Sequence, residues 1–88
     1  MTKELVLESV VTTTEAEKML VLFNDHVNSF DWVIQSLIEV CNHDYAQAEQ
    51  CAIIAHHKGK YGVKAGSFKE LRPRCEALLD RGLTAEIQ

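Results

Sequence analysis

The sequence predicts an α+β fold, a two-layer sandwich in which three helices cover one face of a three-stranded antiparallel sheet in the order β-α-α-β-α-β. Short apolar or alternating runs predict the strands, and apolar stripes between capping residues predict the helices. At 88 residues the chain can build one small core and one domain. The strands are expected at 19–23, 61–65 and 83–87, and the helices at 30–41, 44–59 and 67–82. The order of the strands in the sheet does not follow from this pattern.

The first strand and the first helix have the clearest patterns. Met19–Phe23 is an uninterrupted apolar run, so we expect a strand buried on both faces, and the polar turn formers Asn24 and Asp25 end it. The helix that begins at Phe30 repeats apolar residues at the spacing that buries one face. Its N-cap is expected to be residue 28 or 29, Asn or Ser.

The second helix is expected to begin after the capping residue Asp44 and to end at Gly59, which accommodates a positive φ. Small residues run along its apolar face, and they imply close packing against a neighbour. The second strand follows, because Tyr61, Val63 and Ala65 alternate with polar residues or glycine.

The third helix opens with a capping box formed by Ser67 and Glu70. Pro73 complicates it, because proline removes one helical hydrogen bond. We therefore expect either a short turn over Ser67–Leu71 followed by a new helix, or a kink. Alternation over 83–87 predicts the last strand.

The first 17 residues have no sustained period and are expected to form a flexible N-terminal arm, which leaves 18–88 as the domain. Leu5, Leu7, Val10 and Val11 could instead lay a strand on the domain. No apolar run is long enough for a bilayer and no secretory signal is present, so we expect a cytoplasmic protein that does not enter a membrane.

The charge is divided unevenly between the two parts of the chain. The net charge is −4, made of −7 over residues 1–57 and +3 over 58–88. The basic part lacks an arginine-rich run and interleaved aromatic residues, so a solvated face is the better interpretation than a nucleic-acid site.

The cysteines and histidines do not form a recognised metal motif. Cys41, Cys51 and Cys75 include no CxxC pair, and we expect them to stay reduced and to pack as small apolar groups. Cys41-x-His43 and the pair at 56–57 match no zinc spacing. No metal or other cofactor is expected.

The sequence also lacks the motifs of common enzymes: a glycine-rich phosphate loop, a nucleophile elbow and HExxH. We therefore expect a protein that is not an enzyme. Polar residues gather instead at two element ends, Asn24-Asp25-His26 after the first strand and His56-His57 at the end of the second helix. Each group can also be explained without a function. The first can form a local turn, and the second can be stabilised by the helix dipole at the C-terminus of the helix.

Residues 20–60 resemble the ClpS family of adaptors for the Clp proteases. The resemblance lies in Phe23-Asn24-Asp25 at the end of a strand and His56-x-x-Gly59 at the end of a second helix, with no gap between them. With weaker segments at Gly62-Val63 and Gly82-Leu83 included, it covers about three quarters of the chain. The family has the same β-α-α-β-α-β order.

The resemblance implies an adaptor that binds proteins with a bulky hydrophobic first residue (Leu, Phe, Tyr or Trp), called N-degrons. Such an adaptor hands them to a ClpA- or ClpC-type AAA+ unfoldase for degradation. A free N-terminus is an ammonium with three donors, and it needs converging acceptors. The side-chain carbonyl of Asn24, the carboxylate of Asp25 and a ring nitrogen of neutral His56 would supply them.

The resemblance also assigns walls to a pocket for the first side chain. They are His26, Asn28, Phe30, Val33, Ala52, Ala55 and Leu83. For Val33, Ala52 and Ala55, packing in the core is an equally good explanation. The chain departs from the family at Ser29, where proline is common, at His26, where an acidic or neutral residue is common, and at the two alanines, where larger aliphatic residues are common. A wider pocket would then prefer aromatic first residues over Leu.

Other functions remain open at this point. The same fold occurs in the C-terminal domain of the ribosomal stalk protein, so the chain could be a docking module that holds a protein partner through its basic part. It could also be an adaptor-like domain that docks on an unfoldase without recognising N-termini. In each case we expect a monomer with protein partners and no nucleic acid.

Overall fold

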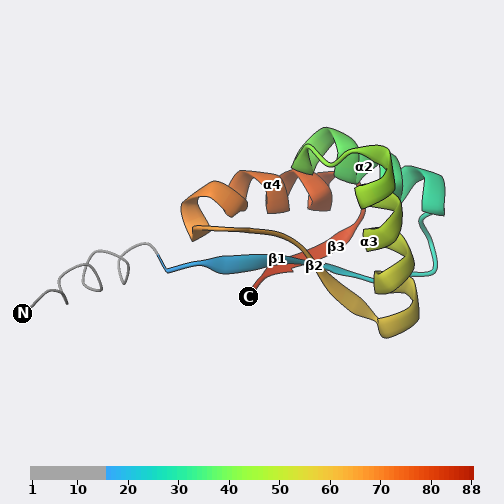
Figure 1. The fold of residues 1–88 in the computed structure, drawn as a ribbon, viewed down its shortest axis with the longest axis horizontal. Coiled ribbons are helices and arrows are strands. Elements are labelled where there is room, and N and C mark those ends of the chain that lie inside the picture. The colour runs from blue at the N-terminus through green and yellow to red at the C-terminus, as the bar shows by residue number, and fades with distance from the viewer. Residues whose placement is uncertain (1–15) are drawn as a thin grey trace, which may run out of the picture.

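The structure, a computed structural model, describes residues 16–88, and it confirms the predicted α+β fold. Most of the predicted N-terminal arm, residues 1–15, lies outside the described residues. The elements are β1 (Lys18–Phe23), α2 (Phe30–Cys41), α3 (Tyr45–Lys58), β2 (Lys60–Gly66), α4 (Phe68–Asp80) and β3 (Thr84–Ile87). Figure 1 shows them in this order, with the helices gathered over the sheet.

The sheet has the order β2-β1-β3, and both pairs are antiparallel. β1 is therefore the central strand, which explains why its apolar run is uninterrupted. Leu20 and Leu22 are almost fully buried beneath the helices, and Val21 on the opposite face is 6% exposed. The last residue of β1, Phe23, pairs with Lys60 on one side and Thr84 on the other, so three elements meet where β1 ends.

The predicted helix caps are found. Ser29, rather than Asn28, caps α2, and its hydroxyl oxygen accepts from the backbone N–H of Trp32 at 3.1 Å. The Asp44 carboxylate caps α3 by accepting from the N–H of Gln47 at 2.7 Å. α4 opens with the expected reciprocal box. The bounds of the helices therefore follow from the sequence.

Pro73 lies inside one uninterrupted helix, α4, so the expected short turn followed by a new helix is wrong. The proline removes the donor that would bond to the carbonyl of Lys69. Both residues are exposed, so water can satisfy that carbonyl. The capping box and the buried residues Leu71, Cys75 and Leu78 hold the helix across this point.

The three cysteines are free and buried in the core, as predicted. Burial raises the pKa of the Cys41 thiol to about 11, so it is neutral at physiological pH. His43 is also buried, and its Nε2 lies 2.8 Å from the carbonyl oxygen of Val63. Among residues 16–88, no three metal-ligating side chains come together, and no helix is long and apolar enough to cross a membrane.

Candidate functional site

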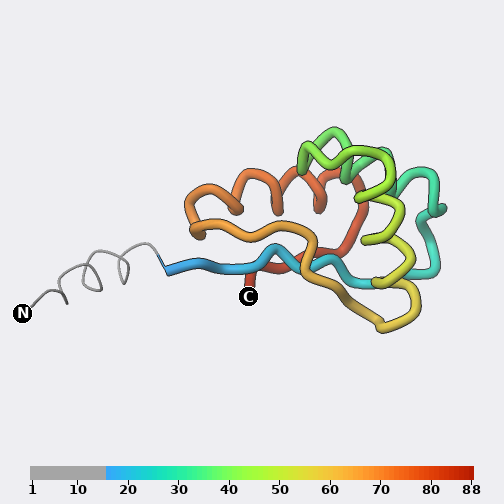
Figure 2. Tube along the Cα trace, viewed as in Figure 1, coloured from blue at the N-terminus to red at the C-terminus, as the bar shows by residue number. Residues whose placement is uncertain are grey.

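The end of β1 and the end of α3 are joined directly. The backbone N–H of Asn24 donates to the carbonyl oxygen of Gly59 at 2.9 Å. Gly59 is the C-cap of α3, with a φ of 93°, and its N–H donates back to Ala55 at 2.8 Å. A residue with a side chain adopts this conformation only with strain, which explains the glycine. Figure 2 shows the two segments, far apart in the sequence, running together.

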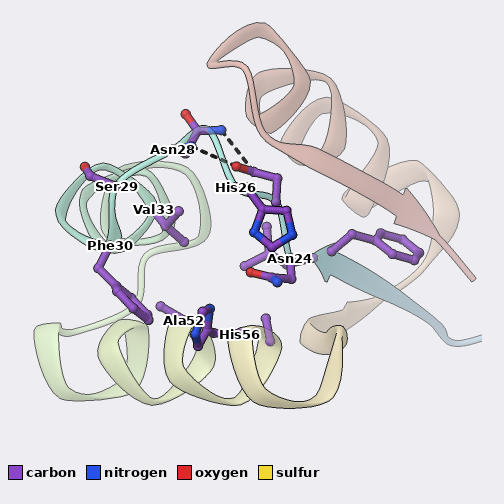
Figure 3. A pocket seen from close by; sticks show the side chains of 12 residues that line it. Asn24, His26, Asn28, Ser29, Phe30, Val33, Ala52 and His56 are labelled. Atoms are coloured by element: carbon purple, nitrogen blue, oxygen red, sulfur yellow. Dashed lines mark hydrogen bonds between the residues drawn. The ribbon is translucent and has the colours of Figure 1, made fainter.

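A pocket of about 290 Å³ opens at this junction (Figure 3). It is lined by Leu22, Phe23, Asn24, Asp25, His26, Asn28, Ser29, Phe30, Val33, Ala52, Ala55 and His56. The lining comes from the end of β1, the loop that follows it, the start of α2 and the second half of α3. Its volume is at the lower limit for small-molecule sites, so it suits one side chain rather than an extended ligand.

The loop after β1 forms a polar wall that Asp25 holds in shape. One carboxylate oxygen, Oδ1, accepts from the backbone N–H groups of Val27 and Asn28, both at 2.8 Å. The other, Oδ2, accepts from the side-chain amide of Asn28 at 3.0 Å. Burial would raise the pKa of the Asp25 carboxyl, but these hydrogen bonds outweigh it and hold the pKa below its ordinary value.

The polar wall is also tied to the turn between α4 and β3. The side-chain amide of Asn28 donates to the carbonyl oxygen of Gly82 at 2.9 Å, and the indole N–H of Trp32 donates to that of Arg81 at 2.9 Å. Arg81 in turn pairs with Glu39 at 2.7 Å. The loop and α2 therefore both have a fixed position relative to the turn between α4 and β3.

The opposite wall belongs to α3, and its residues are both apolar and small. Ala52 and Ala55 are 4% and 2% exposed, and they leave the space that larger side chains would fill. Val33 of α2 completes this apolar part. Phe30 stands at the mouth, 45% exposed, with its ring edge-on to His56 at a centroid distance of 5.3 Å.

Imidazole rings surround the mouth of the pocket. His26 and His56 line it and are exposed, and His57 lies next to His56 at a ring-centroid distance of 5.4 Å. In Figure 3 the side chains of Asn24, His26 and His56 lie around the same opening. Within the described chain, the side-chain hydrogen bonds of the loop over residues 24–28 involve Asp25 and Asn28, and they leave the side-chain amide of Asn24 and the rings of His26 and His56 available to a ligand.

The structure brings together all but one of the residues assigned to the amine site and the pocket walls, and His57 lies beside His56 without lining the pocket. The predicted polar group and the predicted pocket walls line one pocket, except for Leu83. Leu83 is 3% exposed and lies in the hydrophobic core, where it follows the turn that Asn28 contacts. Leu22, Phe23 and Ser29 line the pocket as well. Phe23 and Ser29 directly adjoin predicted site residues, and Leu22 precedes Phe23 in the same strand, so proximity in the sequence is the signal that could have found them.

The arrangement suits binding rather than catalysis. An amide, two imidazoles and a carboxylate lie beside a small apolar cavity, so the pocket can hold an apolar group and a polar group attached to it. The cavity has the size of one amino-acid side chain, and amide and imidazole groups can accept hydrogen bonds from an amine.

Comparisons with known proteins agree with this fold. The solved structure of Agrobacterium tumefaciens ClpS2 bound to L-phenylalaninamide is similar, with a TM-score of 0.69 and 15% sequence identity. The similarity covers 82% of this chain and 94% of that one. No curated protein matches the sequence closely enough to count as a relative.

A comparison with family models identifies the chain itself. Residues 9–86 match the model of the ATP-dependent Clp protease adaptor protein ClpS. The match spans the described fold from β1 to β3, including the whole pocket. It confirms the resemblance carried by Phe23-Asn24-Asp25 and His56-x-x-Gly59, and with it an adaptor family rather than a catalytic one. The chain belongs to the ClpS family of Clp protease adaptors.

Proposed function

We propose that this chain binds proteins with a bulky hydrophobic N-terminal residue and delivers them to a ClpA- or ClpC-type AAA+ unfoldase. The observation that carries the proposal is the pocket at the junction of β1 and α3, where Asn24 and His56 lie beside an apolar cavity. The first side chain of the substrate would fill the cavity. Its free amine would donate to the Asn24 side-chain carbonyl and to a ring nitrogen of His56.

The chemistry of the structural relative's ligand supports this assignment. L-phenylalaninamide carries a free amine next to a benzyl side chain, as a protein with N-terminal Phe does, and ClpS2 is described as bound to it. In the present chain a cavity of about 290 Å³ adjoins groups that accept hydrogen bonds. We propose that the chain acts as a monomer.

The small residues of α3 favour aromatic first residues. Ala52 and Ala55 form the apolar wall, and a larger aliphatic residue at either position would reduce the cavity. A Phe, Tyr or Trp side chain would bury more apolar area there than Leu. We therefore propose a preference for aromatic N-termini over Leu.

A fluorescence titration with matched peptides tests the proposal. A labelled peptide that begins with Phe should bind, and the same peptide with an acetylated N-terminus should bind at least about tenfold more weakly, because it loses the ammonium donors. Equal binding of the two would instead favour a docking module that does not recognise N-termini. Tighter binding of a Leu peptide than of Phe, Tyr and Trp peptides would contradict the aromatic preference.

Delivery needs a separate test with the protease. A model substrate with N-terminal Phe should be degraded faster by ClpA–ClpP or ClpC–ClpP when the full chain is added. The same substrate with N-terminal Ala is the control and should show no acceleration. Acceleration of both substrates, or of neither, would contradict delivery through this pocket.

A further inference from the structure

Among the described residues, Asp25 is the only acid that lines the pocket, and its carboxylate is hydrogen-bonded within its own loop. The Asp25 carboxylate accepts three hydrogen bonds, from two backbone N–H groups and from the Asn28 amide. These donors, together with the neighbouring His26, keep the carboxyl group in its charged form. The ionisable groups that remain at the mouth are the imidazoles of His26 and His56, with His57 beside them.

We propose that His26 selects substrates by the charge of their second residue, and that this pocket favours a hydrophobic first residue followed by Asp or Glu over one followed by Lys or Arg. The inference rests on the proposed function and names the substrate class of the same site. In this proposal the protein recognises the second residue of the substrate through His26, in addition to the first residue, whose side chain the cavity holds.

The size of the pocket places the second residue near His26. The cavity suits a single side chain, so the chain of the substrate must leave it after the first residue, about 3.8 Å further along in Cα spacing. His26 follows Asp25 in the polar wall and is exposed at the mouth. An acidic side chain there could accept a hydrogen bond from the imidazole N–H, and a lysine could not.

The charged group that interacts with His26 is the adjacent Asp25 carboxylate, and the other charges of this region lie farther away. Glu39 and the Trp32 ring engage the Arg81 guanidinium beyond the turn, and Asp31 is an exposed residue of the first turn of α2. Neither Asp31 nor Arg81 lines the pocket. An imidazole that takes up a proton becomes a cation, which attracts an acidic side chain and repels a lysine. The preference for an acidic second residue should therefore increase as the pH falls.

Two peptides that differ only at the second position test the proposal. Peptides beginning Phe-Asp and Phe-Lys, otherwise identical, are titrated by fluorescence anisotropy against the full chain at pH 7.5 and 6.0. The ratio of the two dissociation constants should move about two- to fivefold toward Phe-Asp at the lower pH, the range of an exposed ion pair. In His26→Gln most of this change should be lost, whereas His57→Gln, outside the lining, should retain most of it.

The outcomes separate this inference from the proposed function. A ratio that is the same at both pH values, or that changes in His26→Gln as much as in the wild type, overturns the role of His26. If both peptides still require a free amine in that case, the proposed function stands without this inference. If neither peptide binds, or if acetylation has no effect, the proposed function fails and the inference fails with it. His26 is exposed, so its replacement should leave the melting temperature unchanged, which thermal unfolding checks.

Discussion

The two walls of the pocket are built on different physical principles. The loop after β1 is held by hydrogen bonds: the Asp25 carboxylate accepts from the backbone N–H groups of Val27 and Asn28, and the Asn28 side-chain amide donates to the carbonyl oxygen of Gly82. The α3 wall is defined by the small volume of Ala52 and Ala55. The loop therefore sets the position of polar groups, and the helix sets the size of the cavity. Changes in the two walls should have different effects on binding.

Filling the α3 wall should have the largest effect. Ala55→Phe places a ring in the cavity, so the first side chain of the substrate loses its burial, worth about 1.5–3 kcal/mol. Affinity for a Phe peptide should fall by more than about tenfold. Ala46→Phe, at an exposed position of the same helix, is the matched control. Unchanged affinity in Ala55→Phe would show that the substrate lies elsewhere.

Releasing the loop should have the next largest effect. Asp25→Ala removes the acceptor of three hydrogen bonds, so the polar groups lose their fixed position, and affinity should fall by about 1–2 kcal/mol. Asp25→Asn keeps one carbonyl oxygen for the two backbone donors and should lose less. Asp31→Asn, at an exposed acid of α2, is the control. If Asp25→Asn is as damaging as Asp25→Ala, the carboxylate charge matters more than the shape of the loop.

Acidification should weaken binding through the imidazole at the end of α3. Protonated His56 cannot accept a hydrogen bond from an ammonium and would repel it, so the affinity for an uncharged Phe-Ala peptide should fall between pH 7.5 and 5.5. Titrations across this range measure the effect. In His56→Gln the affinity should be lower at pH 7.5 and should depend less on pH. A flat profile in the wild type would argue against acceptance by this ring.

Weakening α4 should change stability without changing the pocket. Ser67→Ala removes the hydroxyl that accepts from the N–H of Glu70 at 3.1 Å. It should lower the free energy of unfolding by about 0.5–2 kcal/mol, measured by urea denaturation. Affinity for a Phe peptide should remain the same, because α4 does not line the cavity. A parallel loss of affinity would mean that the pocket depends on the whole fold rather than on its two walls.

The sequence predicted those features that depend on neighbouring residues. The apolar run of β1, the stripe of α2 and the caps at Asp44 and Ser67 are local patterns, and all are found. The pocket was implied by the family resemblance that Phe23-Asn24-Asp25 and His56-x-x-Gly59 carry. The order of the strands did not follow, because it depends on which strands pair in space.

Three further details depend on geometry that the sequence does not contain. Asp25 was assigned to the amine of the ligand, and its additional hydrogen bonds within the loop were not foreseen, because they form only once the turn has its shape. Leu83 was assigned to the pocket, and the structure places it in the core, beyond the turn that Asn28 contacts. Pro73 was expected either to separate a short turn from a new helix or to kink the helix, and the structure has one helix there, in which the proline lies on the exposed side.

One measurement addresses the claim that the walls of β1 and α3 together hold a free amine and its side chain. It is a pair of NMR titrations of the isotope-labelled full chain, one with L-phenylalaninamide and one with N-acetyl-L-phenylalaninamide. The first ligand should shift the amide resonances of residues 24–28 and 52–56, and the second should leave them nearly unchanged at the same concentration. Equal shifts with both ligands, or shifts confined to other surfaces, would contradict the account.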